Sequence, residues 1–234
     1  MISDNKTLFV IPARGGSKGI PHKNIALLAG RPLIAYSIDV ALQLADHSMV
    51  CLSTDDDEIR QVAESLGLPV PYRRPAEFAA DTSGSREVIL DAMDYYDRKG
   101  VEYDKVVLLQ PTSPLRTADD VKAAIELYSS EVDMVVSVVE AKANPYYDCF
   151  ETDEEGFLHV SKGDGQLTRR QDAPKAWQYN GAVYVINPQS LRAMPMGSFT
   201  RRVPSPMPKD RSLDIDTPLD LLLAETILNN MSLK

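Results

Sequence analysis

The sequence contains very little cysteine, and it lacks any long hydrophobic run. Cys51 and Cys149 are the only cysteines among 234 residues, which argues against a zinc site or a disulfide framework and fits a reducing compartment. No apolar stretch reaches the roughly 18 residues that span a bilayer, and charges interrupt the N-terminal segment before a signal-like run develops. We therefore expect a cytoplasmic protein that is neither exported nor inserted in a membrane.

Positive charge is also in short supply. The formal net charge is −9 at pH 7, with 25 Lys and Arg against 34 Asp and Glu. This balance excludes a non-specific nucleic-acid binder, because such a protein needs clustered cations to displace phosphate counterions. Residues 11–31 depart from the balance, since they contain four Lys and Arg but no Asp or Glu. A basic segment of this kind in an acidic chain predicts a site for a small anion, with phosphate as the leading candidate.

Apolar segments of strand length alternate along the chain with segments of helical spacing. The predicted strands are 8–12, 49–53, 106–110, 134–139 and 182–186, and the predicted helices are 33–44, 57–66, 85–96, 118–128 and 218–228. This alternation predicts an α/β protein with an open, mostly parallel sheet flanked by helices. In such sheets, ligands bind beyond the carboxyl ends of the strands.

Residues 140–178 break the alternation. The segment is polar, rich in Gly and Asp, and mixed in charge. We expect an inserted arm of short strands, serving as a lid or an oligomer contact, because long structureless loops are uncommon in compact domains. A surface loop without a role is the alternative. The predicted division is therefore a main domain of residues 1–139 and 179–234, with residues 140–178 as the inserted arm.

A glycine-rich turn, IPARGGSKGIPHKN, follows the first predicted strand. Its glycines let the backbone approach a ligand closely, and their N–H groups can cradle phosphate oxygens. Arg14, Ser17, Lys18 and Lys23 would add charge-assisted hydrogen bonds to the same oxygens. The spacing matches neither GxxxxGK[ST] nor GxGxxG, which disfavours a Walker-type NTPase and a dinucleotide-binding protein. A flexible turn with solvated charges is the alternative.

These residues resemble the acylneuraminate (CMP-sialic acid) cytidylyltransferases. The similarity runs in order through IPARGGSKGIPHKN, GRPLIAYSI, STDDDEI, RRPAEFAADTSGS, LLQPTSPLR, YNGAVYVIN and DIDTPLDL. The SKG…KN pattern is closer to the enzymes of nine-carbon sugar acids than to the related Kdo enzymes. The resemblance implies a Rossmann-like nucleotidyltransferase fold, CTP and a nonulosonic acid as substrates, Mg²⁺ as cofactor, and a homodimer. Family members often carry paired aromatics where this chain has the single Phe199, which leaves the exact acceptor open.

The resemblance also assigns roles to individual residues. Those expected to bind the nucleotide are Arg14, Gly16, Ser17, Lys18, Lys23, Asn24, Arg73 and Ser83. Those expected to bind the acceptor are Gln110, Asn180, Tyr184, Lys142 and Arg170, the last two across a dimer interface. Arg14, Lys18 and Lys23 are expected to be catalytic, with Asp216, because fixed cations stabilise charge on the leaving pyrophosphate. A helix N-cap is the alternative for Ser83, and core packing is the alternative for Tyr184.

Asp214 and Asp216 form the predicted metal site. In an extended segment, residues i and i+2 project to the same side, so both carboxylates can reach one cation. Magnesium accepts one or two carboxylates together with substrate phosphates and water. Capping of the following helix is the alternative for Asp216. Arg116, after the prolines of LLQPTSPLR, is expected either to bind the acceptor carboxylate or phosphate or to form a structural ion pair.

The predicted reaction transfers CMP from CTP to the C2 hydroxyl of a nonulosonic acid and releases pyrophosphate. N-acetylneuraminate, Kdn, legionaminic acid and pseudaminic acid remain open as acceptors, because they differ by single hydroxyl, amino or acyl groups. No histidine is an evident general base, which leaves a metal-bound species or an aspartate for proton removal. Two alternatives remain: a sugar nucleotidyltransferase with another nucleotide or acceptor, and a non-catalytic nucleotide-binding protein.

Overall fold

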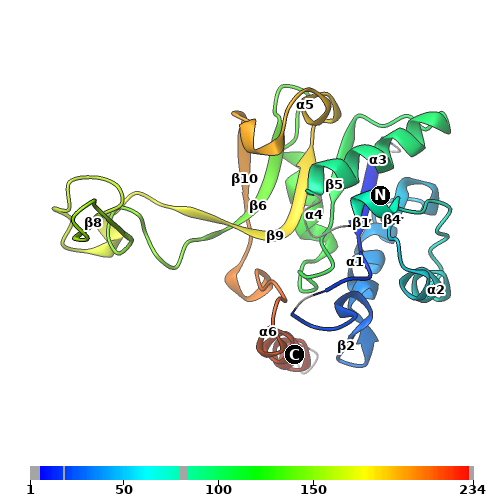
Figure 1. The fold of residues 1–234 in the computed structure, drawn as a ribbon, viewed down its shortest axis with the longest axis horizontal. Helices are drawn as coiled ribbons and strands as arrows, with labels where there is room; N and C mark the ends of the chain where they lie inside the picture. Colours follow the sequence, from blue (N-terminus) through cyan, green and yellow to red (C-terminus); the bar gives the residue numbers. More distant parts are fainter. Residues whose placement is uncertain (1–5, 18, 80–83, 232–234) are drawn as a thin grey trace.

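A six-stranded sheet organises the computed structural model, which describes residues 6–17, 19–79 and 84–231 (Figure 1). The strand order is β10-β6-β9-β5-β1-β4. The bounds are β1 Thr7–Pro12, β4 Val50–Ser53, β5 Lys105–Leu108, β6 Met134–Glu140, β9 Trp177–Ile186 and β10 Arg202–Pro206. β1 is parallel to β4 and β5, β10 is parallel to β6, and β9 is antiparallel to both of its neighbours. The expected open, mostly parallel sheet is confirmed.

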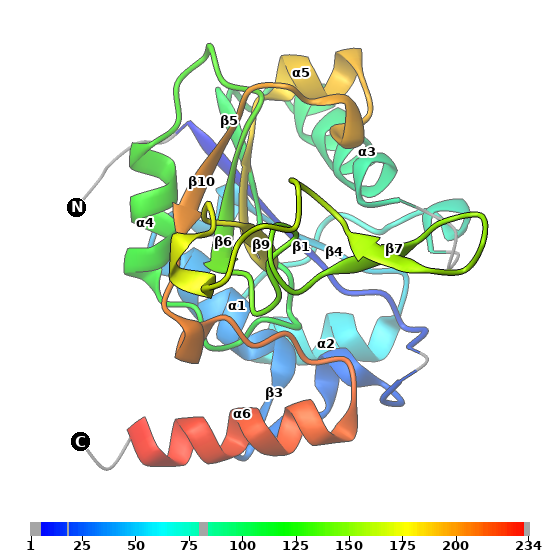
Figure 2. The ribbon, with the colours of Figure 1, turned by 90° about the vertical axis from the view of Figure 1, so that its left-hand side faces the viewer.

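Helices cover both faces of the sheet (Figures 1 and 2). Their bounds are α1 Leu33–Leu42, α2 Asp57–Ser65, α3 Ser85–Arg98, α4 Ala118–Glu126, α5 Pro188–Ala193 and α6 Pro218–Met231. Along β1, Phe9 and Ile11 pack with α1, α2 and α4, whereas Leu8 and Val10 pack with α3 and α5. This alternation explains why β1 is apolar at nearly every position, since both of its faces are covered.

A smaller cluster of side chains attaches α6 beside the sheet. Leu28 of β2 (Leu27–Leu28), which pairs with β3 (Arg31–Pro32), packs with Leu33, Ile215 and Ala224. Ile215 is fully buried, so the Asp214–Asp216 segment is pinned to the body by its middle residue. The DIDTPLDL segment therefore lies next to the elements that follow the glycine turn.

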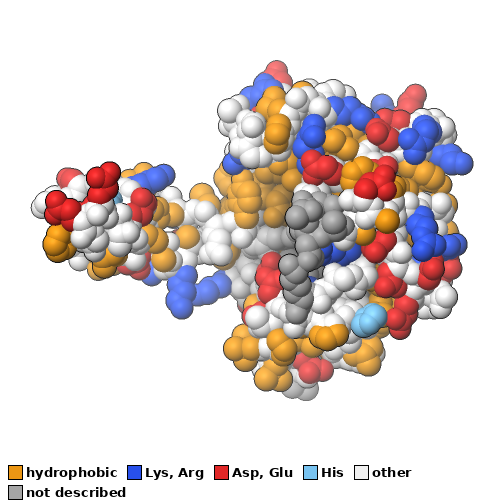
Figure 3. Space-filling view, viewed as in Figure 1, with side chains coloured by type: hydrophobic (Ala, Val, Ile, Leu, Met, Phe, Trp, Pro, Cys, Tyr) orange, Lys and Arg blue, Asp and Glu red, His pale blue; other side chains and the backbone are white. Residues whose placement is uncertain are grey.

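An arm extends from the sheet between β6 and β9. The main-chain ladder of these strands continues where the Ala141 N–H donates to the Ala176 carbonyl at 2.9 Å. The outer part contains two short antiparallel strands, β7 Phe150–Thr152 and β8 Leu158–Val160, at the left of Figure 1. Several large hydrophobic side chains of this region are exposed: Phe150, Phe157, Leu158, Trp177 and Tyr179. Figure 3 shows hydrophobic side chains on the surface of the arm. None of the three hydrophobic clusters of described residues includes a residue between 141 and 176.

Both cysteines are free, with Cys51 buried in the body and Cys149 partly buried in the arm. Within the described ranges, no helix has the length and apolar content needed to cross a bilayer.

Candidate active site

The glycine turn leaves β1 at the carboxyl edge of the sheet, where neighbouring acids hold it in place. The Gly15 N–H donates to Asp55 at 3.2 Å, and a Cβ on Gly15 would lie only 2.5 Å from an oxygen of Asp56. Asp56 also caps α2 by accepting from the Glu58 and Ile59 N–H groups at 2.8 and 3.1 Å. Glycine is required at position 15 because an acidic side chain occupies the space that any larger residue would need.

The far side of the turn meets the C-terminal aspartate segment. A Cβ on Gly19 would lie 2.1 Å from the Asp216 carbonyl oxygen, so the two backbones touch. Lys23 donates to the Ile215 carbonyl at 2.8 Å and to Asp216 Oδ1 at 3.0 Å. Segments nearly two hundred residues apart in the chain are thus brought to the same side of the molecule.

Between them lies a cavity of about 290 Å³. Its lining includes the predicted site residues Arg14, Gly16, Ser17, Lys23, Asn24, Gln110 and Asp216. The amide of buried Asn24 donates to the Arg14 carbonyl at 2.9 Å, which fixes the backbone that carries Arg14. Two of the predicted nucleotide contacts, Lys18 and Ser83, lie outside the described residues.

The aspartate pair fits a divalent cation. Partial burial, followed by the charge of Asp216, raises the pKa of Asp214, although a hydrogen bond from Thr112 and the charge of Lys23 oppose this. The described residues contain no cluster of three or more His, Cys, Asp or Glu. Asp216 lines the first cavity, with Asp214 two residues before it, and carboxylate oxygens of this kind suit a hard divalent cation.

Helix capping does not use Asp216. The N-terminus of α6 is capped by Thr217, whose hydroxyl accepts from the Asp220 N–H at 3.3 Å. Asp220 in turn accepts from the N–H groups of Asp216 and Thr217 at 3.1 and 2.7 Å. The Asp216 side chain is 73% exposed, so it remains available to a cation.

A second cavity of about 310 Å³ shares Arg14 and Gln110 with the first, and it also contains Arg74. The buried Arg74 guanidinium donates to the Ser53 hydroxyl and carbonyl at 3.0 and 2.6 Å. Arg73, the residue expected from sequence to contact the nucleotide, instead forms an exposed ion pair with Asp57 at 2.9 Å. Of the two adjacent arginines, Arg74 lines this cavity and Arg73 does not. In an extended segment, alternate side chains point to the same side. Tyr72 and Arg74 are buried and Arg73 is exposed, so the spacing of two from the aromatic Tyr72 was the sequence signal that favoured Arg74 as the inward-pointing arginine.

Asn180 lies at the start of the buried part of β9, and its side chain is engaged inside the fold. The side-chain oxygen of Asn180 accepts from the Ser137 hydroxyl at 2.5 Å and from the Ala182 N–H at 3.2 Å. Its amide donates to Ser212 at 2.9 Å and to the Met207 sulfur at 3.4 Å. These four hydrogen bonds use both acceptor sites and both donors of the side-chain amide inside the fold, and the acceptor contact of Asn180 stays a prediction.

Gly181 and Tyr184 of β9 lie near Asp214 and near Gln110, which follows β5. Gly181 has φ +74°, and a Cβ there would lie 2.9 Å from the Gln110 side-chain oxygen and 3.5 Å from an oxygen of Asp214. Tyr184 is partly buried against the core, and its pKa is raised by burial and then by the charge of Asp214. Gln110, Tyr184 and Asp214 are thus close together, and the packing alternative for Tyr184 does not exclude a place beside the site.

Lys142 and Arg170 lie in the arm and line neither of these cavities. Arg170 donates to the Ala141 carbonyl at 3.0 Å and to the Lys142 carbonyl, and it lies 3.9 Å from Asp148. The two basic residues that were expected to act across a dimer interface are therefore held together at the base of the arm.

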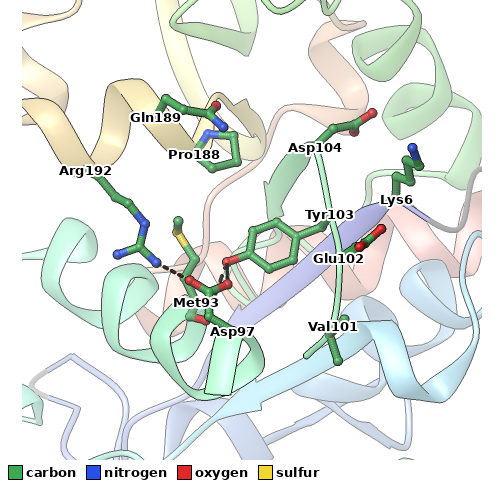
Figure 4. A pocket seen from close by; sticks show the side chains of 10 residues that line it. All are labelled: Lys6, Met93, Asp97, Val101, Glu102, Tyr103, Asp104, Pro188, Gln189 and Arg192. Carbon is green, nitrogen blue, oxygen red and sulfur yellow. Dashed lines mark hydrogen bonds and ion pairs between the residues drawn. The ribbon is translucent and has the colours of Figure 1, made fainter. Parts of the chain in front are cut away.

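A larger hollow of about 370 Å³ lies at the opposite edge of the sheet, where β1 and β5 begin (Figure 4). Two of its charged groups are paired, since Asp97 accepts from the Tyr103 hydroxyl and from Arg192, both at 2.6 Å. It contains none of the predicted site residues. The smaller cavities at the carboxyl edge are the better candidates, in line with the general position of ligands in open α/β sheets.

An open α/β sheet whose carboxyl edge brings a cationic glycine turn against paired carboxylates defines a nucleotide-binding protein of the nucleotidyltransferase class. The chain belongs to the cytidylyltransferase family, whose model matches residues 8–231. It is accordingly a CTP-dependent nucleotidyltransferase, and this family generally uses a divalent metal ion.

Three relatives are similar over nearly the whole chain. The chain is 34% identical to the CMP-N,N'-diacetyllegionaminic acid synthase of Legionella pneumophila, covering 95% of this chain and 96% of that protein. It is 32% identical to the pseudaminic acid cytidylyltransferase of Campylobacter jejuni, covering 95% and 96%. It is 35% identical to the N-acylneuraminate cytidylyltransferase of Streptococcus agalactiae over 93% of this chain, but it spans only about half (52%) of that relative's length.

Solved structures with low identity support the fold. A CMP:2-keto-3-deoxy-manno-octonic acid synthetase complexed with CTP aligns with a TM-score of 0.70 at 18% identity, covering 97% of this chain and 99% of that one. The 4-diphosphocytidyl-2C-methyl-D-erythritol synthase of Anaerococcus prevotii aligns with a TM-score of 0.65 at 11% identity, covering 97% and 100%.

Proposed function

We propose that the protein transfers CMP from CTP to the C2 hydroxyl of a nine-carbon 2-keto sugar acid, with release of pyrophosphate. The observation that carries this proposal is the shared cavity in which Arg14 and Lys23 face Asp216. The relatives named for legionaminic, pseudaminic and N-acylneuraminic acid all match more than nine tenths of the chain. Use of CTP, a product of cytoplasmic nucleotide metabolism, is the basis for proposing that the protein acts in the cytoplasm.

CTP would occupy both cavities at the carboxyl edge. The first, lined by glycine N–H groups, Arg14 and Lys23, suits the triphosphate, because backbone donors and fixed cations stabilise phosphate charge. The second, lined by Val88 and Leu108 together with Arg74, Ser85 and Gln110, suits the ribose and base, because it offers hydrogen-bonding groups beside two apolar side chains. Arg14 and Gln110 line both cavities, so they would lie near the α-phosphate between them.

Asp214 and Asp216 would hold Mg²⁺. When bound there, the ion would neutralise negative charge on the phosphates of CTP. Lys23, fixed by the Ile215 carbonyl at 2.8 Å, keeps a cation beside the carboxylates and the phosphate cavity. In the reaction, the C2 hydroxyl of the sugar acid would give its proton to an aspartate carboxylate of the site, and its oxygen would form a bond to the α-phosphorus while the bond to pyrophosphate breaks. Arg14 and Lys23 stabilise the charge that develops on the leaving group.

The sugar acid would lie beside Asp214, near Gln110 and Tyr184. Its carboxylate needs cations, and Lys142 and Arg170 of the arm would supply them from a second copy of the chain. The arm carries exposed Phe150, Phe157 and Leu158, which gives it apolar area to bury against that copy. A homodimer, with residues 140–178 as the dimerisation element, follows from this proposal.

A substrate panel tests the proposal. Pyrophosphate release is measured with each of the four ribonucleoside triphosphates against N-acetylneuraminate, Kdn, legionaminic acid, pseudaminic acid and a hexose 1-phosphate, with and without Mg²⁺. We expect turnover only with CTP, a nonulosonic acid and Mg²⁺ together. Turnover with a hexose 1-phosphate or another nucleotide would favour a different sugar nucleotidyltransferase. CTP binding without turnover on any acceptor would favour a non-catalytic nucleotide-binding protein.

A further inference from the structure

Arg116 is buried without a carboxylate to neutralise it. The residue is 3% exposed, and no ion pair joins it to an acid among the described residues. One guanidinium nitrogen donates to the carbonyls of Gln110 and Ser113 at 2.7 and 2.6 Å, and another donates to the Ser37 hydroxyl. Its Nε is the one buried side-chain nitrogen or oxygen without a hydrogen bond in the described part of the chain. Neither expected role, acceptor binding or a structural ion pair, matches these contacts.

Removing an arginine from water in this way is unfavourable. Burial alone lowers the pKa of Arg116 to about 9. An unpaired buried cation generally destabilises a fold relative to an apolar residue of similar size. A residue that is unfavourable for stability yet fully enclosed beside the active site indicates that its hydrogen bonds do something that an apolar side chain would not.

Those hydrogen bonds stabilise the bend after β5, whose own main chain offers few hydrogen-bond donors. Pro111 and Pro114 have no N–H group, so the bend after β5 lacks two of the main-chain donors that a turn normally uses. Within it, the Ser113 N–H donates to the Gln110 carbonyl at a long 3.3 Å. The planar guanidinium reaches both carbonyls and Ser37 of α1 at once, which an ammonium group on a flexible chain would not reproduce.

The same bend touches the remaining parts of the active site. The Thr112 carbonyl accepts from the Ile215 N–H at 2.7 Å, which ties the bend to the aspartate pair. The Ser113 hydroxyl donates to the main-chain carbonyl of Asn180 at 3.4 Å, and this hydrogen bond connects the bend to β9. The side chain of Gln110 lines both nucleotide cavities. A shift of the bend would therefore move Gln110 and the Asp214–Asp216 segment together.

We infer that Arg116 is a positioning residue for cytidylyl transfer. It holds the Gln110–Ser113 bend against α1, so that Gln110 faces the nucleotide and Thr112 fixes the aspartate pair. Arg116 itself lines neither cavity and acts only through these neighbours. The inference rests on the proposed function, because it assigns Arg116 a part in that reaction.

Two substitutions separate its charge from its hydrogen bonds. Arg116→Lys keeps the positive charge but loses the planar guanidinium group with its several N–H donors. Arg116→Gln keeps an N–H donor but loses the charge. Arg86→Lys is the matched control, because the Arg86 guanidinium also clamps main-chain carbonyls, those of Leu191, Arg192 and Met194 at 2.9 to 3.1 Å. Arg86 lines neither nucleotide cavity. The kinetic constants and the Mg²⁺ concentration for half-activation are measured well below each variant's Tm.

We expect both Arg116 variants to lower kcat by about 10- to 100-fold, the usual effect of removing a residue that orients a metal ligand. The Mg²⁺ concentration for half-activation should rise several-fold, and the KM for CTP should change less. Arg86→Lys should lower Tm and keep wild-type kinetic constants. If the Arg116 variants also lose only thermal stability, with kcat and the Mg²⁺ requirement unchanged, the inference is overturned.

Two further measurements keep the inference testable if these variants fail to fold or if the wild type turns over no acceptor. Ser37→Ala removes only the α1 anchor of Arg116 and should shift kcat and the Mg²⁺ requirement in the same direction by a smaller factor; no shift contradicts the inference. Calorimetric titration with CTP gives a readout that needs no acceptor. The gain in CTP affinity caused by Mg²⁺ should shrink in Arg116→Lys even if the wild type shows no turnover, which would refute only the proposed function. An unchanged gain would refute the role of Arg116.

Discussion

The nucleotide cavities and the arm are built in opposite ways. Around the cavities, hydrogen bonds join segments far apart in the chain, such as Lys23 to Asp216 at 3.0 Å and Ile215 to Thr112 at 2.7 Å. In the arm, hydrogen bonds join residues of the arm to one another, over longer separations at its base and locally in the outer hairpin, where Asp153 accepts from the Phe157 N–H at 2.9 Å. The Phe157 side chain itself is 67% exposed. Distant segments of one chain therefore build the cavities proposed for the nucleotide, whereas the arm has exposed apolar surface.

The largest effect should come from Asp216→Ala. Removing this carboxylate takes away half of the predicted metal site, so we expect pyrophosphate release to fall by about 10³-fold or more. The fold should persist, because Thr217 and Asp220 cap α6 without the Asp216 side chain. Pyrophosphate assays and thermal melting check both statements. Asp119→Ala is the control, since the Asp119 side chain is 89% exposed and pairs with Lys122 on the surface. Near-normal turnover in Asp216→Ala would refute the metal assignment.

Gly19→Ala should have the next largest effect. Its new Cβ would lie 2.1 Å from the Asp216 carbonyl oxygen, so the glycine turn and the aspartate segment must separate. A displacement of about 1 Å between reacting groups can lower turnover by about 10²-fold, and we expect a loss of that order together with weaker CTP binding.

Gly197→Ala is the matched control for this prediction, because a Cβ at Gly197 would meet nothing within 4 Å. Steady-state kinetics and CTP titration of both variants make the measurement. If Gly19→Ala behaves like Gly197→Ala, the contact between the two segments has no importance for the site.

A double substitution in the arm, Phe157→Ser with Leu158→Ser, should affect only the acceptor half. Both side chains are exposed, so we expect a folded chain that no longer dimerises, with the KM for the sugar acid raised about 10-fold by loss of the second copy's cations. CTP affinity should stay unchanged. Light scattering, acceptor kinetics and CTP titration test these points, with Glu154→Ser on the same hairpin as control. A variant that stays dimeric, or a monomer with a normal acceptor KM, would contradict the proposed role of the arm.

The comparison also separates what the sequence predicts from what it does not. Buried strands such as β1 and periodic helices such as α3 were predicted because burial on two faces or on one leaves a clear pattern. β10 was missed because Pro204 and Pro206 argue against a strand, yet both are tolerated at the sheet edge, where β10 pairs only with β6. The reversed direction of β9 has no local signature.

The site residues divide in the same way. Residues of the glycine turn and the two aspartates were predicted to share a cavity, and Arg14, Gly16, Ser17, Lys23 and Asp216 line one, whereas Asp214 is not part of its lining. Arg73 and Asn180 were assigned from the family resemblance, which does not contain the ion pair of Arg73 with Asp57 or the internal partners of Asn180, Ser137 and Ser212. Contacts between distant segments are the part that single-sequence patterns do not contain.

The smallest effect is expected for the ion pair between Asp120 and Arg211 in the main domain, which is compared with the Arg169–Asp172 pair in the arm. Burial opposes ionisation of Asp120, but bonds from Arg211, at 2.8 and 3.0 Å, and from Thr117 hold its pKa below the usual 3.8. Because the folded state favours the carboxylate, this stabilisation is present above about pH 4 and is lost as the pH falls through the lowered pKa. Asp120→Asn should therefore reduce the free energy of unfolding at pH 7 by about 1–3 kcal/mol.

Denaturant unfolding between pH 7 and pH 3 measures this effect, and the difference between wild type and Asp120→Asn should vanish toward the acid end. Asp172→Asn is the matched variant in the arm, where the Arg169–Asp172 pair is close at 2.7 Å but exposed. Solvent screening makes such pairs worth about 0–1 kcal/mol, so Asp172→Asn should change stability little. If both variants lose the same stability with the same pH dependence, the segment leading to Asp214 is held no more firmly than the arm. The nucleotide cavities and the arm would then differ only in the hydrogen bonds that line the cavities.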